Sequence, residues 1–309
     1  MRGLITILII ILLLPVFATE IELVPEAQLI NHSSEYYFGF PITMTILDNE
    51  LYVMDQKSGK VHVFAEESLQ YLRSFGELGS EPGQFDRPVS IASDIYGNIV
   101  ISDYNNDRFQ TLTPYGEFVE ELYQYYPWRM NYFADELYVD LFPGVDEAGI
   151  YLLDSNEFYQ QLDINRYFKK ENFSSVLEKY YSWCVTDWGY VLSFSGRDKV
   201  VLFNRKGRKL KTEVEPLPFS LPNTLYGKPN PYNGGFLLLG SANDHVVADT
   251  TGAKVNNEGF LGYYGKDGKL INTYKLPDNV WLTDTWTING DKIYLYDSGR
   301  LVINRFRID

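Results

Sequence analysis

The chain has 309 residues, with 41 acidic against 27 basic side chains and a formal net charge of −14. Nucleic acid is a poor partner for such a chain, because phosphate backbones are bound by clustered Lys and Arg. The single cysteine, Cys184, excludes an intrachain disulfide, so the core must stabilise the fold. Hydrophobic residues make up 45% of the chain and aromatic residues 16%, with 25 Tyr, which favours strands.

The N-terminus has the layout of a secretory signal peptide over residues 1–18. Arg2 precedes an almost uninterrupted apolar run from Leu4 to Leu14, and Pro15–Ala18 supplies small residues for cleavage. The alternative is a retained membrane anchor, but the run is shorter than the roughly 20 residues that a spanning helix needs. We therefore expect an exported protein, periplasmic or extracellular, with no membrane insertion after cleavage. Its acidic charge then serves mainly to keep it soluble.

One short apolar strand signature recurs along the rest of the chain, usually after a turn pair such as Gly97-Asn98. The six copies begin at Leu51, Ile99, Leu137, Tyr190, Phe236 and Ile293. Their average spacing is about 48 residues, which lies in the range of propeller repeats. The chain therefore consists of six similar units.

Several units carry a second signature, in which two strands flank a tight turn that contains Gly. The turns are Thr113–Gly116, Asn204–Gly207 and Gly265–Gly268. Such turns predict hairpins, and with a strand before the first signature each unit becomes a four-stranded meander. The sequence thus predicts an all-β fold: a six-bladed β-propeller of four-stranded antiparallel blades over residues 19–309. We place the blades at approximately 38–79, 85–126, 127–168, 174–219, 221–277 and 280–309, the last completed by 20–31.

Two further elements follow from this reading. The best helical candidate is Glu171–Lys179, as one or two turns on a loop between units. The last unit lacks a fourth strand, and the N-terminal segment can supply it, which would protect an open sheet edge. We therefore expect the strand near Leu23 to pair with the strand near Ile303 and close the ring.

The second unit resembles the NHL repeat. The pattern runs from Phe75-Gly76 through Pro82-Gly83-Gln84-Phe85 to Asp103, Asn106 and Arg108. The other units match only in outline. The resemblance implies a propeller, commonly six-bladed, that presents a binding face, and NHL relatives include sensor domains, adaptors and a few lyases and lactonases.

Within that motif, Asp103 and Asn106 are expected to tie the loop after the second strand, with Arg108 beginning the third. Asp103-x-Asn105-x-Asp107 superficially resembles the start of a calcium loop, but the required Gly and Glu are missing. We therefore predict a structural role for these residues.

The sequence contains no persuasive catalytic constellation. His32 lies in the closing segment, His62 in a third strand where side chains pack between blades, and His245 in a loop. Three histidines in such unlike positions do not suggest a zinc site. Cys184 lies in an apolar strand and is expected to be a buried small hydrophobe. No cofactor is predicted, and a divalent metal in the channel, calcium or zinc, belongs only to the alternative function.

Residues that lead into each innermost strand should gather at one mouth of the central channel. Aromatic and Arg side chains dominate these positions, as they do at interaction hot spots. The predicted binding face comprises Phe40, Arg87, Trp128, Arg129, Tyr181 and Trp281, with Asn230 and Tyr232 on a long insertion. The alternative to a binding role is a structural one, in which the large aromatic side chains pack between blades.

Three functions remain open at this point. The leading one is a non-catalytic scaffold of the cell envelope or exterior that binds a protein, peptide or glycan. The second is a lactonase-like or lyase-like enzyme with a metal in the channel, and the third is a structural subunit of an envelope complex.

Overall fold

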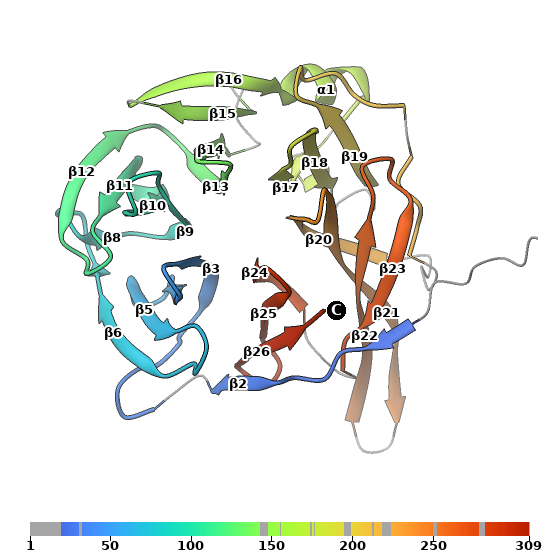
Figure 1. The fold of residues 1–309 in the computed structure, drawn as a ribbon, viewed down its shortest axis with the longest axis horizontal. Coiled ribbons are helices and arrows are strands. Elements are labelled where there is room, and N and C mark those ends of the chain that lie inside the picture. The colour runs from blue at the N-terminus through green and yellow to red at the C-terminus, as the bar shows by residue number, and fades with distance from the viewer. Residues whose placement is uncertain are drawn as a thin grey trace, which may run out of the picture.

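Six β-sheets are arranged around a central axis, and the chain forms a six-bladed β-propeller (Figure 1). The computed structural model describes residues 20–30, 33–142, 148–154, 156–173, 175, 177–194, 199–211, 213–217, 224–249, 252–277 and 282–308. The all-β, six-bladed prediction is confirmed, with sheets that follow one another in chain order. The predicted signal peptide lies outside the described residues, and no described helix is long and apolar enough to span a membrane.

Each blade is counted here from the channel outward. Blade 1 comprises β3 (Pro41–Leu47), β4 (Glu50–Asp55), β5 (Lys60–Ala65) and β6 (Tyr71–Phe75). Blade 2 comprises β9 (Pro88–Ser93), β10 (Ile99–Asp103), β11 (Arg108–Leu112) and β12 (Phe118–Tyr123). Blade 3 comprises β13 (Pro127–Phe133), β14 (Glu136–Leu141), β15 (Gly149–Asp154) and β16 (Glu157–Asp163). Blade 4 comprises β17 (Ser182–Val185), β18 (Gly189–Phe194) and β19 (Lys199–Asn204). Blade 5 comprises β20 (Thr224–Tyr232), β21 (Gly235–Asp249), β22 (Gly252–Tyr264) and β23 (Leu270–Lys275). Blade 6 comprises β24 (Leu282–Asn289), β25 (Lys292–Asp297) and β26 (Val302–Arg307).

Shorter elements connect or complete the blades. They are β1 (Glu20–Glu22), β2 (Ala27–Ile30), the parallel pair β7 (Glu77–Leu78) and β8 (Gln84–Phe85), the 3-10 turns η1 (Tyr104–Asn106) and η2 (Leu177–Lys179), and the helix α1 (Ile164–Lys170).

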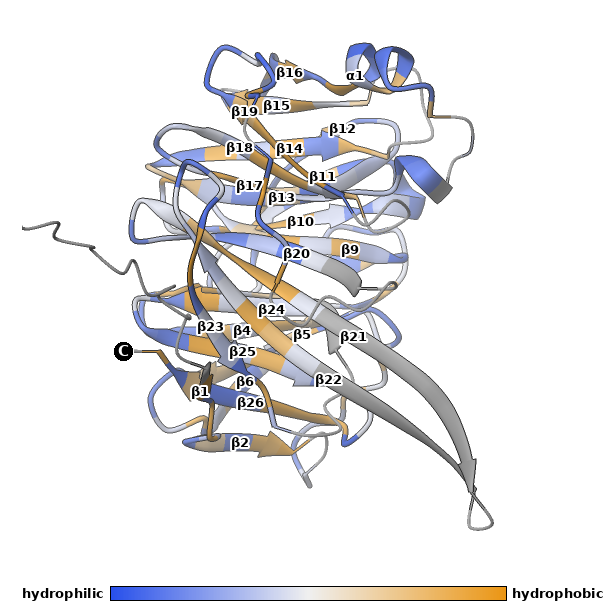
Figure 2. Ribbon diagram, turned by 90° about the vertical axis from the view of Figure 1, so that its right-hand side faces the viewer, coloured by the Kyte–Doolittle hydropathy of each residue, from blue (hydrophilic) through white to orange (hydrophobic). Residues whose placement is uncertain are grey.

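The apolar strand signature forms the second strand of every blade, as predicted. β10 and β18 are buried along their whole length, and β4 and β25 along all but one residue. Both faces of these strands are covered by neighbouring blades, which is why the sequence shows continuous apolar runs rather than alternation. Figure 2 shows the apolar strand segments lying between polar turns.

The core is divided into six apolar clusters, one at each junction between neighbouring blades. Tyr52 and Val63 of blade 1, for example, meet Ile91 and Ile101 of blade 2. The five other clusters join the remaining pairs of neighbours around the ring. Because burial depends on adjacent blades rather than on one centre, the middle of the ring can stay open.

The N-terminal segment closes the ring from within the predicted residues 20–31, but the predicted pairing of Leu23 with Ile303 was wrong. β2 pairs antiparallel with β26, and Leu29 lies opposite Ile303. Leu23 instead follows β1, which runs parallel to β23 of blade 5, and its backbone N–H donates to Lys275. The N-terminus therefore stabilises two blades, and the strand partner of Ile303 lies six residues later than predicted.

Blade 4 departs from the four-stranded pattern among the described residues. Its sheet contains β17, β18 and β19, and only a single bridge between Phe203 and Lys209 marks the start of a fourth strand. The α-helix before it is α1, which the sequence analysis did not predict; of the predicted Glu171–Lys179, the described residues Leu177–Lys179 form the 3-10 turn η2. Asp163 caps α1 by accepting a hydrogen bond from the Arg166 N–H, and this capping was not recognised in the sequence.

Blade 5 contains the two longest strands, β21 and β22. They pair with each other from Phe236–Tyr264 out to Asp249–Gly252, beyond the reach of β20 and β23. The prediction that His245 lies in a loop was wrong, because it belongs to β21. Asn230 and Tyr232 likewise lie in β20, the innermost strand, and not on an insertion.

The NHL-like motif of blade 2 forms a buried hydrogen-bond network, as expected. The Asp103 carboxylate accepts from Arg108 Nε at 3.0 Å and from Asn106 Nδ2 at 2.8 Å. Arg108 also donates to the backbone oxygens of Glu81 and Gln84, which lie in the loop before the innermost strand. These bonds account for the motif as a clamp between the loop and the outer strands.

Candidate functional site

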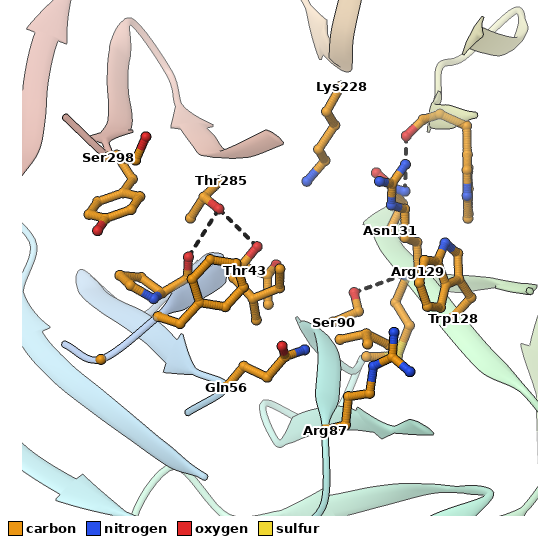
Figure 3. A pocket seen from close by; sticks show the side chains of 18 of the residues that line it. Thr43, Gln56, Arg87, Ser90, Trp128, Arg129, Asn131, Lys228, Thr285 and Ser298 are labelled. Carbon is orange, nitrogen blue, oxygen red and sulfur yellow. Dashed lines mark hydrogen bonds between the residues drawn. The ribbon is translucent and has the colours of Figure 1, made fainter. Parts of the chain in front are cut away.

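A pocket of about 570 Å³ lies in the central channel, where all six blades meet (Figure 3). Its volume falls in the range of ligand-binding pockets. Polar, cationic and aromatic side chains from every blade line it. They come from blade 1 (Phe40, Thr43, Gln56), blade 2 (Arg87, Ser90), blade 3 (Trp128, Arg129, Asn131), blade 4 (Trp183), blade 5 (Lys228) and blade 6 (Thr285, Ser298).

Irregularities in the innermost strands shape this pocket. In β13, Trp128 and Arg129 both lie opposite Asp140 alone, because the register shifts between Pro127 and Met130. In β20 the shift falls between Tyr226 and Pro229, at Lys228. Similar shifts interrupt β3, β9 and β24 at pocket-lining residues. A bulge redirects the side chains of the strand that carries it, and here the redirected side chains line the channel.

Buried aspartates at the ends of second strands hold the loops that lead to the pocket. Asp55 accepts hydrogen bonds from the backbone N–H groups of Gly39 and Phe40, and Asp103 from that of Asp86. Asp140 accepts from the Arg129 N–H at 2.6 Å. All three aspartates are fully buried. The same residue in each of these blades therefore positions the side chains at the mouth.

Among the side chains that the structure describes, the pocket lining carries three cations and no carboxylate. Arg87 stacks on the Tyr104 ring at 5.0 Å and has no ion-pair partner in the described part of the chain. Arg129 donates to the Tyr181 carbonyl oxygen and the Ser182 hydroxyl. Lys228 points into the pocket from the side opposite Arg87 (Figure 3). The chain is acidic as a whole, so this local reversal of charge is notable.

Asp140 lies beneath the lining and titrates near neutrality. Burial raises the pKa of its carboxyl to about 7, although Arg129 and the hydrogen bond from Trp183 Nε1 favour the ionised form. Burial, together with the Asp140 charge, also raises the pKa of the Tyr181 hydroxyl. The charge below Arg129 therefore changes with pH in the physiological range.

An aromatic cluster forms the wall of the pocket beside blade 3. The Trp128 ring packs edge-to-face against Phe142 at 5.0 Å and Tyr104 at 5.5 Å. Its indole N–H is buried and has no acceptor among the described residues. A buried donor without a partner costs about 1–3 kcal/mol, so this N–H lowers the stability of the wall that it belongs to.

The structure brings together half of the predicted binding face. Phe40, Arg87, Trp128 and Arg129 all line the pocket. Tyr181, Asn230 and Tyr232 do not line it. The first two are buried, and Tyr232 packs against Tyr263 at 5.1 Å beside the cluster between blades 5 and 6. Trp281 lies outside the described residues.

Several pocket residues were missed by sequence reasoning. Lys228 was hidden by the bulge at Pro229, since regular alternation does not apply there. Asn131 follows the bulge in β13 and donates to the Trp183 carbonyl oxygen. Gln56 could have been found, because it directly follows the Asp that ends the second strand; its amide donates to the Pro88 carbonyl oxygen.

The groups considered for metal or nucleophilic chemistry lie elsewhere. No cluster of three or more His, Cys, Asp or Glu in the described ranges is arranged to hold a metal ion. His62 is buried beside Tyr36 and Phe38, and burial lowers the pKa of its imidazole. Cys184 is fully buried, which raises the pKa of its thiol. His32 is not among the described residues.

Solved propellers of several kinds share this fold. A DUF4221 family member from Bacteroides vulgatus matches with a TM-score of 0.56 and 12% identity, covering 94% of this chain and 98% of that one. A Bacteroides fragilis protein thought to be exported matches at 0.55 and 12%, covering 89% and 83%. A catalytically inactive Staphylococcus aureus virginiamycin B lyase, solved with quinupristin, matches at 0.53 and 11%, covering 89% and 84%.

Identities this low show a common fold and leave the function open. No protein-family model matches the sequence. The NHL resemblance therefore remains an interpretation of the motif in one blade, while the six-bladed propeller is established.

Proposed function

We propose that the protein is an exported binding protein that holds a peptide or glycan ligand in the central pocket, without catalysing a reaction. The observation that carries this proposal is the pocket itself, which combines aromatic walls with three cationic side chains and amides contributed by different blades. Such a mixture of apolar surface and few convergent polar groups is typical of ligand sites.

Rigid positioning supports binding as the task of this site. Hydrogen bonds from buried Asp55 and Asp140 fix the backbone on which Phe40 and Arg129 sit. Gln56 and Asn131 are each held by a bond to a neighbouring strand. A preorganised pocket loses little conformational entropy when its ligand arrives.

Binding screens against glycan and peptide libraries test this proposal. We expect the protein to retain at least one library member and the double variant Arg87→Ala/Trp128→Ala to lose it, because both side chains line the pocket. A thermal melt of the double variant checks that it is folded, and Arg208→Gln, an exposed site outside the pocket, is the matched control. Wild-type affinity in the folded double variant would overturn the proposal.

A metal-dependent lyase or hydrolase is the second candidate, favoured by the fold that the chain shares with the virginiamycin B lyase. Elemental analysis of the purified protein, dialysed without chelator, separates the two functions. A stoichiometric divalent metal would support the enzyme, whereas a metal-free protein that binds its ligand would support the scaffold.

Export rests on the signal-peptide layout of residues 1–18 and agrees with the similar fold of the Bacteroides fragilis protein. Expression in a bacterial host, followed by N-terminal sequencing of the periplasmic fraction, should give a chain that begins at Thr19. A chain retained in the cytoplasm with its N-terminus intact would contradict export.

A further inference from the structure

We propose that the ligand is a glycan with carboxylate-bearing sugars, and that Arg87 and Lys228, on opposite sides of the central pocket, attract its carboxylates. This inference rests on the proposed function and specifies the chemistry of the ligand.

The first argument is the distribution of charge. A chain with a net charge of −14 would be expected to show acidic side chains on most of its surface. The lining side chains that the structure describes instead include Arg87, Arg129 and Lys228 and no carboxylate. Cations in a concave site with apolar walls concentrate their field there, which favours an anionic ligand.

Three aspartates beneath the pocket lining have protein partners. Asp103 pairs with Arg108 at 3.0 Å, and Asp297 lies 3.5 Å from Arg300. Asp55 accepts hydrogen bonds from backbone N–H groups and from the Ser58 hydroxyl at 2.6 Å. These aspartates are fully buried beneath the lining and do not reach the pocket surface. None of these three carboxylates is therefore available to pair with Arg87.

Arg87 is also held in a conformation that a side chain disfavours. Its φ of +53° lies in the left-handed region, and it precedes Pro88, which begins β9. Glycine adopts this conformation at lower cost. A strained residue that retains a long cationic side chain at a pocket mouth points to a role for that side chain.

The shape and polarity of the pocket favour a sugar over a peptide. Peptides usually bind as added strands or along grooves, whereas this pocket is a compact space enclosed by six blades. Amides and hydroxyls surround it on several sides, among them Gln56, Asn131 and Thr43 (Figure 3). Trp128 adds an aromatic surface. A compact ligand with hydroxyls in several directions matches this arrangement.

Isothermal titration calorimetry with a panel of uronic-acid disaccharides tests the inference. Each disaccharide is paired with its carboxyl-reduced, neutral counterpart, and tri-aspartate represents an acidic peptide. We expect at least one uronate to bind. Its neutral counterpart should bind at least about tenfold more weakly, because it lacks the charge-assisted hydrogen bonds of the carboxylate. Higher ionic strength should weaken the binding.

Variants locate the carboxylate within the pocket. Arg87→Gln and Lys228→Gln should each weaken uronate binding about tenfold or more, and should weaken binding of the neutral sugar by a smaller factor. Arg208→Gln, on the outer hairpin of blade 4, is the matched loss of one charge and should have no effect.

Three results would overturn the inference: no uronate binds, neutral sugars bind equally well, or tri-aspartate binds more tightly than any uronate. None of these overturns the proposed function, which fails only if the folded Arg87→Ala/Trp128→Ala variant keeps its ligand in the library screens.

Discussion

The central pocket and the groove between blades 2 and 3 have opposite charge. The groove, about 430 Å³, has an apolar floor that includes Val100, Phe109 and Leu137. Its described rim carries only carboxylates as charged groups, namely Asp94, Glu120, Asp135, Glu136 and Asp154. Among the side chains that the structure describes, the charged groups that line the central pocket are all cations. The groove thus has the same sign of charge as the whole chain, whereas the described lining of the central pocket has the opposite sign.

The carboxylates of the groove have local structural tasks. Asp94 accepts hydrogen bonds from the N–H groups of Tyr96 and Asn98 and so shapes a turn. Asp135 accepts from the Tyr132 hydroxyl, and Glu120 from the Asn156 amide. The cations of the pocket come from separate blades, and no single turn requires them together. Local structure accounts for the carboxylates of the groove, whereas the cations of the pocket are explained by the ligand that we propose.

The largest effect is expected from the floor of the central pocket. Trp183 is fully buried and donates to Asp140 at 2.8 Å. Trp183→Ala should lower the free energy of unfolding by about 3–5 kcal/mol, because it leaves a cavity and an unpaired buried acceptor. Urea titration measures this loss. Trp183→Phe keeps most of the ring and should lose less; equal losses would show that the cavity does not matter.

A smaller effect should appear when the pH is varied. The pKa of Asp140 is raised to about 7 in the folded protein, so its stabilising contribution is present in full below pH about 4. That contribution is lost as the pH rises to about 7, amounting to about 2 kcal/mol between pH 5 and pH 7.

Asp140→Asn removes this titration. The difference in unfolding free energy between wild type and variant should therefore change with pH over this window and become constant above it. Using the difference cancels His62, whose lowered pKa acts in the opposite direction. A pH-independent difference would show that Asp140 does not titrate there.

The smallest effect is expected at the groove. Glu120→Gln removes a charge whose hydrogen-bond partner is the exposed Asn156 amide, at 3.3 Å. It should change the unfolding free energy by less than about 0.5 kcal/mol and leave binding in the central pocket unaltered. Urea titration and calorimetry measure both. A loss of ligand affinity comparable to that of Arg87→Gln would remove the distinction between the two regions.

The sequence by itself determined the number of blades, the identity of their second strands and the hairpins between outer strands. Continuous apolar runs predict buried strands wherever they occur, and glycines mark turns locally: Gly116 and Gly207 both have positive φ. The clamp of Asp103, Asn106 and Arg108 was also readable, because all its members lie within one blade.

Only the tertiary structure decided which side chains reach the centre. Phe40, Arg87, Trp128 and Arg129 were found from their place before or at the innermost strands, but Lys228 was not, and Tyr181 proved to be buried outside the pocket lining. The physical reason is that bulges in β13 and β20 break the two-residue alternation of side chains. The pocket also joins residues from six blades, and their proximity arises only when the ring closes.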